Sequence, residues 1–153
     1  MPRRFPLQSL HDLAADRLEA ASRRLAELKR TWQAAEDKLA KLRDYQQEYR
    51  QRLGQAVREG LDVTRMRDFH AFLAKIEVAI RHQLAEVERC RQAWEHGQRV
   101  WLEERRKLKT YEVLKARHAA SERVRENRLE QRDQDEHARR IRAATPHLPR
   151  GED

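Results

Sequence analysis

The chain has few of the residues that interrupt helices. Among its 153 residues are only four glycines and four prolines, and all the prolines lie close to one end or the other. A proline in a helix interior costs about 3 kcal/mol and a glycine about 1 kcal/mol. Nothing therefore prevents helix formation from about residue 8 to 53 or from about residue 64 to 143. Gly54 and Gly60 mark the one break between these stretches.

Cysteine and long apolar runs are also scarce. The single cysteine, Cys90, excludes an intramolecular disulfide, and we expect it to be a buried reduced thiol. No apolar run approaches the roughly 20 residues of a membrane-spanning helix. Charged and polar residues soon follow Arg3 and Arg4, so we expect no secretory signal. These features favour a cytoplasmic protein without direct insertion into a membrane.

The sequence lacks the usual patterns of catalytic, cofactor and metal sites. It contains no glycine-rich phosphate loop, and none of its seven histidines lies four residues from another or at metal-ligand spacing from the cysteine. Aromatic residues make up only 6%, and no basic block is free of acidic residues. We predict that the protein is not an enzyme, has no catalytic residues, and uses no metal, no cofactor and no nucleic-acid partner.

What the sequence does contain is two long runs of apolar residues that repeat every seven positions. The first comprises Leu7, Ala14, Ala21, Leu28, Ala35, Leu42, Tyr49 and Ala56, interleaved with Leu18, Leu25, Trp32, Leu39, Gln46 and Leu53. The second comprises Met66, Leu73, Ile80, Val87, Trp94, Trp101 and Leu108, interleaved with Phe69, Ile76, Gln83, Cys90, Gly97, Glu104 and Tyr111. An apolar spacing of 3.5 residues on average is typical of helices that coil around each other. The pattern predicts an all-α fold.

The short break between the two runs predicts an antiparallel hairpin. Asp62 or Thr64 can cap the second helix after the break. We predict one coiled-coil domain over residues 1–143, with a helix at 8–56, a turn at 57–63, a helix at 64–143, and a disordered tail at 144–153. The second helix is the longer one, so beyond about residue 115 we expect it to overhang without a partner in the chain.

Residue sizes indicate how the helices are paired. If the turn is centred on residue 61, Leu25 faces Gly97 and Trp32 faces Cys90, so that large side chains meet small ones. A shift by one heptad, which places Trp32 opposite Gly97, stays open, and so does a parallel homodimer. Three polar residues at apolar positions should fix the pairing at some cost in stability. They are Gln46, Gln83 and Glu104.

The net charge of +8 is unevenly distributed along the chain. Residues 1–56 contain 12 basic and 8 acidic residues, residues 57–98 contain 7 of each, and residues 99–153 contain 15 and 11. In a hairpin, the excess positive charge collects at the end that carries both termini, and the turn end is neutral. Interspersed charges of both signs are also typical of any solvated helical surface.

Apolar residues extend beyond the repeat near the turn, at flanking positions where a coiled coil normally carries charge. The flanking residues are Lys38, Tyr45, Phe72 and Ala79, and the strip that they form includes Leu42, Tyr49 and Ile76. One interpretation is a broader contact between the two helices. The other is a docking site for another protein, since exposed aromatic groups are enriched at interfaces.

Three sequence motifs resemble those of a known family. They are Leu7-Gln8-Ser9-Leu10-His11-Asp12-Leu13-Ala14, Asp44-Tyr45-Gln46-Gln47-Glu48-Tyr49-Arg50, and Glu126-Asn127-Arg128-Leu129-Glu130-Gln131 followed by Asp135-Glu136. With the length and the two-helix plan, these motifs resemble the flagellar export protein FliJ and the wider FliJ/YscO-like family. The resemblance covers nearly the whole chain.

The resemblance implies a soluble component of the flagellar type III export apparatus that is similar to the central stalk of rotary ATPases. Such a protein inserts into the hexameric export ATPase, promotes its activity, and binds the cytoplasmic domain of the membrane export gate protein. Export chaperones are further expected partners, and the expected location is peripheral to the inner membrane at the flagellar base. The equivalent stalk of a virulence secretion system and a passive coiled-coil adaptor or export chaperone are the alternatives.

The resemblance also assigns residues to the export gate, and the charge distribution suggests residues for the ATPase ring. The gate-binding positions of the family correspond here to Lys38, Leu42, Tyr45, Tyr49, Phe72, Ile76, Ala79 and Gln83, which overlap the apolar strip. The family favours glutamine at position 38 and histidine at position 83, whereas this chain has Lys38 and has its histidine one place early, at His82. For the ATPase ring, the basic terminal end supplies Arg3, Arg4, Arg123, Arg125, Glu126, Asn127, Arg128 and Gln131.

Overall fold

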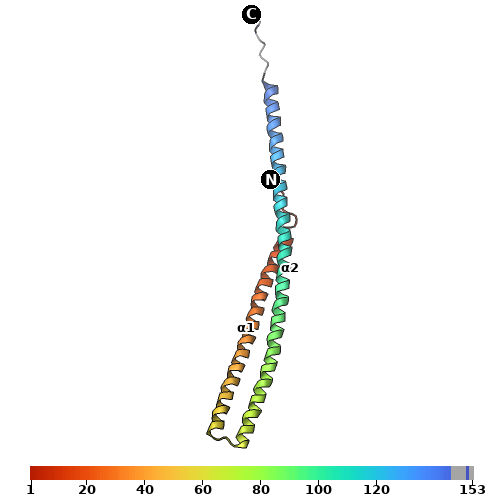
Figure 1. Cartoon of the computed structure of the whole chain (residues 1–153). Helices are drawn as coiled ribbons and strands as arrows, with labels where there is room; N and C mark the ends of the chain where they lie inside the picture. The colour runs from red at the N-terminus through yellow and green to blue at the C-terminus, as the bar shows by residue number, and fades with distance from the viewer. Residues whose placement is uncertain (146–150, 152–153) are drawn as a thin grey trace. The chain divides into compact units, whose positions relative to one another are not determined.

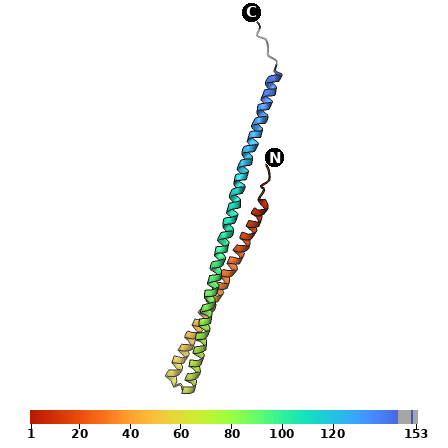
Figure 2. The ribbon, with the colours of Figure 1, turned by 90° about the vertical axis from the view of Figure 1, so that its right-hand side faces the viewer.

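The computed structural model of the chain describes residues 1–145 and 151. These residues form two α-helices, α1 (Gln8–Glu59) and α2 (Val63–Ala144), and contain no β-strand. The helices are joined by a short turn and run in opposite directions (Figures 1 and 2). The predicted all-α hairpin is confirmed.

Different residues of the turn end α1 and begin α2. Gly60 has a positive φ of 91° and donates its N–H to the carbonyl oxygen of Val57 at 3.3 Å, as glycines that follow a helix commonly do. Asp62 then accepts a hydrogen bond from the backbone N–H of Arg65 at 2.7 Å, which caps the start of α2. Of the two predicted caps, the structure thus shows Asp62 in use.

The observed helix bounds differ slightly from the predicted ones. Helix α1 continues to Glu59, beyond the predicted end at 56, because Gly54 is accommodated inside the helix and only Gly60 adopts a conformation that ends it. Helix α2 ends at Ala144. The tail predicted from 144 onward falls mainly on residues 146–150 and 152–153, which lie outside the described residues.

The chain divides into two compact units. The turn unit comprises residues 16–105, and the terminal unit comprises residues 1–15 together with residues 106–153. The core of the turn unit is a buried cluster of Leu39, Ile76 and Ile80. Its half-buried neighbours are Leu42, Tyr49, Phe72, Leu73 and Val87. Each large apolar side chain removed from water contributes roughly 1.5–3 kcal/mol to stability when fully buried.

Contacts in the turn unit define how the two helices are paired. A Cβ atom added to Gly97 would lie 2.6 Å from Leu28 Cδ1 and 3.6 Å from Leu25 Cδ1, so α1 comes very close to α2 here. The contact with Leu25 agrees with a turn centred near residue 61 and not with the pairing that places Trp32 opposite Gly97. The ring of Trp32 instead packs against Trp94, with 5.4 Å between ring centroids. That ring contact was not anticipated from the sequence.

Cys90 lies on the contact between the helices, as its place in the apolar repeat predicted. Its side chain is a free thiol and is only 3% exposed. Burial raises the pKa of this thiol above its usual value, and the nearby Glu86 carboxylate adds to the effect. Both effects favour the protonated, unreactive form.

The terminal unit contains a contact that the sequence analysis missed. Residues 1–7, which we call the N-terminal arm, lie along α2 and bond to His118, Glu122 and Arg125. The expectation that α2 has no partner beyond residue 115 is therefore wrong for this stretch, because backbone groups of the arm provide one. From residue 127 to residue 145 every side chain is exposed, so the overhang begins two residues after Arg125.

Candidate interaction surfaces

An aromatic cluster lies on the turn unit near the end of the hairpin, and we call it the aromatic surface (Tyr45, Tyr49, Phe69 and Phe72). Tyr49 packs against Phe72 and Phe69, with ring centroids 4.5 and 5.0 Å apart. Tyr45 meets the edge of Phe72 at 6.0 Å and lies 6.5 Å from Tyr49. Tyr45 nevertheless remains 43% exposed. A rigid aromatic group that is supported from below and open to solvent is well suited to contact another protein.

The eight residues that the sequence assigned to the gate divide by burial. Lys38 and Tyr45 are exposed, whereas Leu42, Tyr49, Phe72 and Ala79 are half-buried. Ile76 and Gln83 are buried, at 5% and 8% exposure. The part of this set that a partner can reach is therefore centred on Tyr45, and Ile76 belongs to the buried cluster against which Tyr49 and Phe72 pack. Phe69 was missed as a member because its heptad position assigned it to the core.

The burial of Gln83 has a specific cause. Its side-chain amide nitrogen donates a hydrogen bond to the backbone carbonyl oxygen of Ala35 at 2.9 Å. Ala35 belongs to α1 and Gln83 to α2, so this bond joins the two helices. A buried amide that found no partner would lose about 1–3 kcal/mol, which makes the pairing that satisfies it strongly preferred. This agrees with the predicted role of Gln83 in fixing the pairing.

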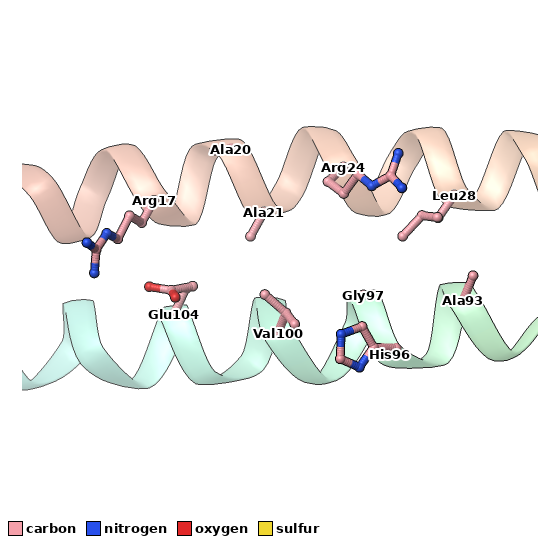
Figure 3. Close-up of a pocket in the computed structure, with 10 residues that line it drawn as sticks. All are labelled: Arg17, Ala20, Ala21, Arg24, Leu28, Ala93, His96, Gly97, Val100 and Glu104. Atoms are coloured by element: carbon pink, nitrogen blue, oxygen red, sulfur yellow. The ribbon is translucent and has the colours of Figure 1, made fainter.

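A groove lies beside the closest approach of the two helices in the turn unit. Its volume is about 590 Å³, and its lining includes small residues of both helices, Ala20 and Ala21 of α1 and Ala93 and Gly97 of α2. Figure 3 shows Leu28 and Val100 extending into the space between the helices. Arg17, Arg24, His96 and Glu104 complete the lining. The charged side chains that line the groove are of both signs.

The N-terminal arm is attached to α2 mainly through its own backbone. The N–H of Arg3 donates to Glu122 Oε2 at 3.0 Å, and the carbonyl oxygen of Arg3 accepts a hydrogen bond from His118 Nε2 at 2.9 Å. The Arg125 guanidinium reaches the carbonyl oxygen of Met1 at 3.4 Å. The Phe5 ring packs on the imidazole of His118, with centroids 5.6 Å apart. Four contacts thus hold residues 1–5 against one stretch of α2.

The pKa of Glu122 is consistent with its role in holding the N-terminal arm. The bond from the Arg3 backbone N–H lowers the pKa of the Glu122 carboxyl, and the Arg125 side chain, at 2.8 Å, lowers it further. Desolvation acts in the opposite direction but does not prevail. Glu122 is therefore ionised at neutral pH while it is only 8% exposed. Neither Glu122 nor His118 was recognised from the sequence, since both resemble ordinary charged positions of a helix surface.

The structure places the residues predicted for the ATPase ring in different environments of the terminal unit. Arg3, Arg4, Arg123, Asn127, Arg128 and Gln131 are exposed, and Arg125 and Glu126 are half-buried. Arg125 is occupied by Glu122 and Met1, so its role in this structure is to hold the arm. Arg3 and Arg4 line different cavities, one beside α2 and the other beside the first turn of α1.

Among residues 1–145 and 151, no group of histidine, cysteine, aspartate or glutamate side chains could hold a metal ion. Neither helix, as far as it is described, contains a stretch apolar and long enough to cross a membrane.

Two long helices packed through an apolar repeat define a coiled-coil hairpin protein whose candidate sites are surfaces on its helices. Comparison with known proteins identifies the family. The profile of the Flagellar FliJ protein family matches residues 3–145. The chain is 31% identical to the Flagellar FliJ protein of Salmonella typhi and 32% identical to that of Escherichia coli (strain K12). Each alignment spans 140 residues, 92% of this chain and 95% of the relative.

The chain therefore belongs to the FliJ family. Membership makes it a component of the flagellar export apparatus, in a family whose part in export is non-catalytic.

Proposed function

We propose that this protein acts as a stalk-like component of flagellar export, binding the hexameric export ATPase through its terminal unit and the cytoplasmic domain of the export gate through its turn unit. Family membership supports a role in export. The charge distribution supports a basic surface on the terminal unit, which contains 15 basic and 10 acidic residues, whereas residues 57–98 of the turn unit contain 7 of each.

The observation that carries gate binding is the exposure of Tyr45. This side chain contacts two other aromatic rings and still keeps 43% of its surface open to solvent. Aromatic anchors of this kind dominate the energy of many protein interfaces. Two other predicted gate-binding residues are not fully buried. Lys38 is an exposed charged side chain, and Ala79 is a small, half-buried one.

Binding of the ATPase is supported by the exposed basic residues of the terminal unit. Arg3, Arg4, Arg123 and Arg128 are all exposed, and an excess of positive charge accelerates association with an acidic partner. Through these two partners the protein would be held peripherally at the inner membrane at the flagellar base. Export chaperones would be further partners of the same complex.

Gate binding is tested by isothermal titration of the cytoplasmic gate domain with the Tyr45→Ala variant. We expect the affinity to fall about tenfold or more, which is the loss of roughly 1.4 kcal/mol or more that is typical of an interface anchor. Leu102→Ala is the matched control, because Leu102 is exposed to a similar extent, at 40%, and lies outside the aromatic surface. Equal affinities for wild type and Tyr45→Ala would refute the assignment.

The rate of ATP hydrolysis by the export ATPase distinguishes a stalk from a passive adaptor. We expect the wild-type chain to increase ATP hydrolysis by the cognate export ATPase, since a stalk acts on the ring that surrounds it. An adaptor that only links other proteins would bind without changing the rate. The measurement is the steady-state release of phosphate with and without the full chain.

A further inference from the structure

A pocket in the terminal unit is formed jointly by the N-terminal arm and α2. It has a volume of about 290 Å³. Phe5 and Ala119 contribute apolar surface to it, and Arg3, Lys115 and Arg123 contribute cationic side chains. The arm provides two of these five residues, so the pocket exists only while the arm is held in place.

The way the arm is held leaves the Arg3 side chain available. Glu122 and His118 bond to the backbone N–H and carbonyl oxygen of Arg3 and make no use of its guanidinium. Within residues 1–145 and 151, neither Arg3 nor Arg123 takes part in an ion pair. The guanidinium groups of Arg3 and Arg123 therefore line the same pocket, and their N–H groups are available to a ligand.

The charge balance of the pocket is positive. Two acidic residues also line it, Glu122 and Glu126. Glu122 already accepts hydrogen bonds from the Arg3 backbone and from Arg125, which offsets its charge. The three cationic side chains of the pocket therefore outnumber Glu126, the one acidic side chain whose charge is not offset in this way.

We propose that this pocket binds an acidic segment of the export ATPase, with carboxylates of the segment paired to Arg3, Lys115 and Arg123 and a small apolar side chain packed on Phe5 and Ala119. Guanidinium groups pair with carboxylates through two parallel hydrogen bonds, which gives both strength and geometry. Glu122 and His118 act as positioning residues, since their hydrogen bonds to the Arg3 backbone hold the arm. The proposal rests on the proposed function in so far as it names the ATPase as the source of the segment.

The first test measures binding of the full chain to the cognate export ATPase after single charge reversals. We expect Arg3→Glu, Lys115→Glu and Arg123→Glu each to weaken binding about tenfold or more. Arg117→Glu is the matched control, because Arg117 lies on the same stretch of α2, is exposed, and does not line the pocket. Equal weakening by Arg117→Glu would show general charge attraction and would overturn the proposal, as would unchanged binding by the three pocket variants.

The second test separates the pocket from net charge. Glu122→Gln makes the chain more positive, so general attraction to an acidic partner predicts tighter binding. Our proposal predicts weaker binding, by about the factor seen for Arg3→Glu, because the arm loses a charge-assisted bond and the pocket opens. Hydrogen exchange at the Arg3 amide reports the release of the arm directly. Tighter ATPase binding by a variant with a released arm would overturn the proposal.

A third test keeps the pocket testable if the proposed function fails. If the wild-type chain does not bind the ATPase, the proposed function is wrong, and the pocket is then titrated by NMR with a synthetic peptide of glutamate and leucine. We expect shifts concentrated at the amides of Arg3, Lys115 and Arg123. Shifts spread evenly over exposed arginines, or stronger binding of a single-stranded oligonucleotide of equal charge at the same three residues, would refute an acidic protein segment as the occupant.

Discussion

The side-chain amide of Gln83 on α2 donates a hydrogen bond to the backbone carbonyl oxygen of Ala35 on α1, 2.9 Å away and in the buried contact between the helices. The two residues are 48 positions apart in the sequence. Most other side-chain bonds of the turn unit join residues three or four positions apart on one helix, and those bonds do not depend on how the helices are paired. The Gln83–Ala35 bond forms only in one alignment.

Substitutions of Gln83 test whether its bond to Ala35 chiefly stabilises the fold or chiefly determines how the two helices are aligned. Gln83→Ala should lower the free energy of unfolding by about 1–2 kcal/mol, because both the bond and its packing are lost. Gln83→Leu should stay within about 1 kcal/mol of wild type, since an apolar side chain fits the apolar contact. Urea unfolding followed by circular dichroism gives both values. If the leucine variant lost as much stability as the alanine variant, the bond would be a main source of stability and not chiefly of alignment.

The sequence predicts the hairpin well because one physical pattern determines it. Apolar residues at an average spacing of 3.5, few helix-breaking residues and a short break leave little choice other than two antiparallel helices. Tyr45 could be recognised for the same reason, since an aromatic residue at a flanking position departs from the pattern. The sequence alone does not distinguish which glycine ends α1, because Gly54 and Gly60 differ only in the structure, where Gly60 adopts a positive φ.

The N-terminal arm could not be predicted from the sequence. It is attached through the backbone atoms of Arg3 and Met1, which every residue type possesses, so no side-chain pattern reveals the contact. The packing of Trp32 on Trp94 was missed for a different reason. Large aromatic side chains reach beyond the layer that heptad positions define, and the sequence alone does not give their rotamers.

Gly97 should tolerate only a small addition. An alanine Cβ would lie 2.6 Å from the end of the Leu28 side chain, which can rotate toward the adjoining groove. Alanine also favours the helix by about 1 kcal/mol, so Gly97→Ala should change stability by less than about 1 kcal/mol.

Gly97→Val is the corresponding variant that the contact should not tolerate. Its branched side chain should cost about 1–3 kcal/mol through overpacking. Thermal unfolding of the three proteins checks both values. A valine variant as stable as wild type would show that the helices do not come into close contact at this position.

The attachment of the arm should depend on pH through Glu122. The pKa of this carboxyl is lowered in the folded chain from its usual value of 4.5, first by the Arg3 backbone N–H and then by Arg125. A lowered pKa means that the stabilisation is complete above 4.5 and is lost as the pH falls through the folded value. Amide exchange at Arg3 should therefore accelerate in acid.

The Glu122→Gln variant provides the control for this pH dependence. Its side chain does not titrate, so exchange at the Arg3 amide should be faster than in wild type at neutral pH and should show no such step in acid once intrinsic exchange rates are subtracted. An identical acid step in the variant would assign the pH dependence to another group.

A distance measurement tests whether one chain forms the hairpin by itself. The pKa of Glu86 is lowered chiefly by its bond with Arg89 and to a smaller extent by Lys38, which agrees with the close approach of the two helices that the Gln83–Ala35 bond shows. Spin labels at Lys38→Cys and Glu86→Cys, with Cys90→Ala to remove the native thiol, should give a single short distance. Dilution with an excess of unlabelled protein should leave it unchanged. A short distance that disappears on dilution would instead indicate a dimer.

The most direct test of the central claim, that one chain serves two partners through two separate surfaces, is a paired assay of gate binding and ATPase stimulation. The variants are Tyr45→Ala in the aromatic surface and Arg123→Glu in the pocket of the terminal unit. We predict that Tyr45→Ala loses gate affinity and keeps ATPase stimulation, and that Arg123→Glu loses ATPase stimulation and keeps gate affinity. Both variants losing both activities together, or neither variant losing either, would contradict the account.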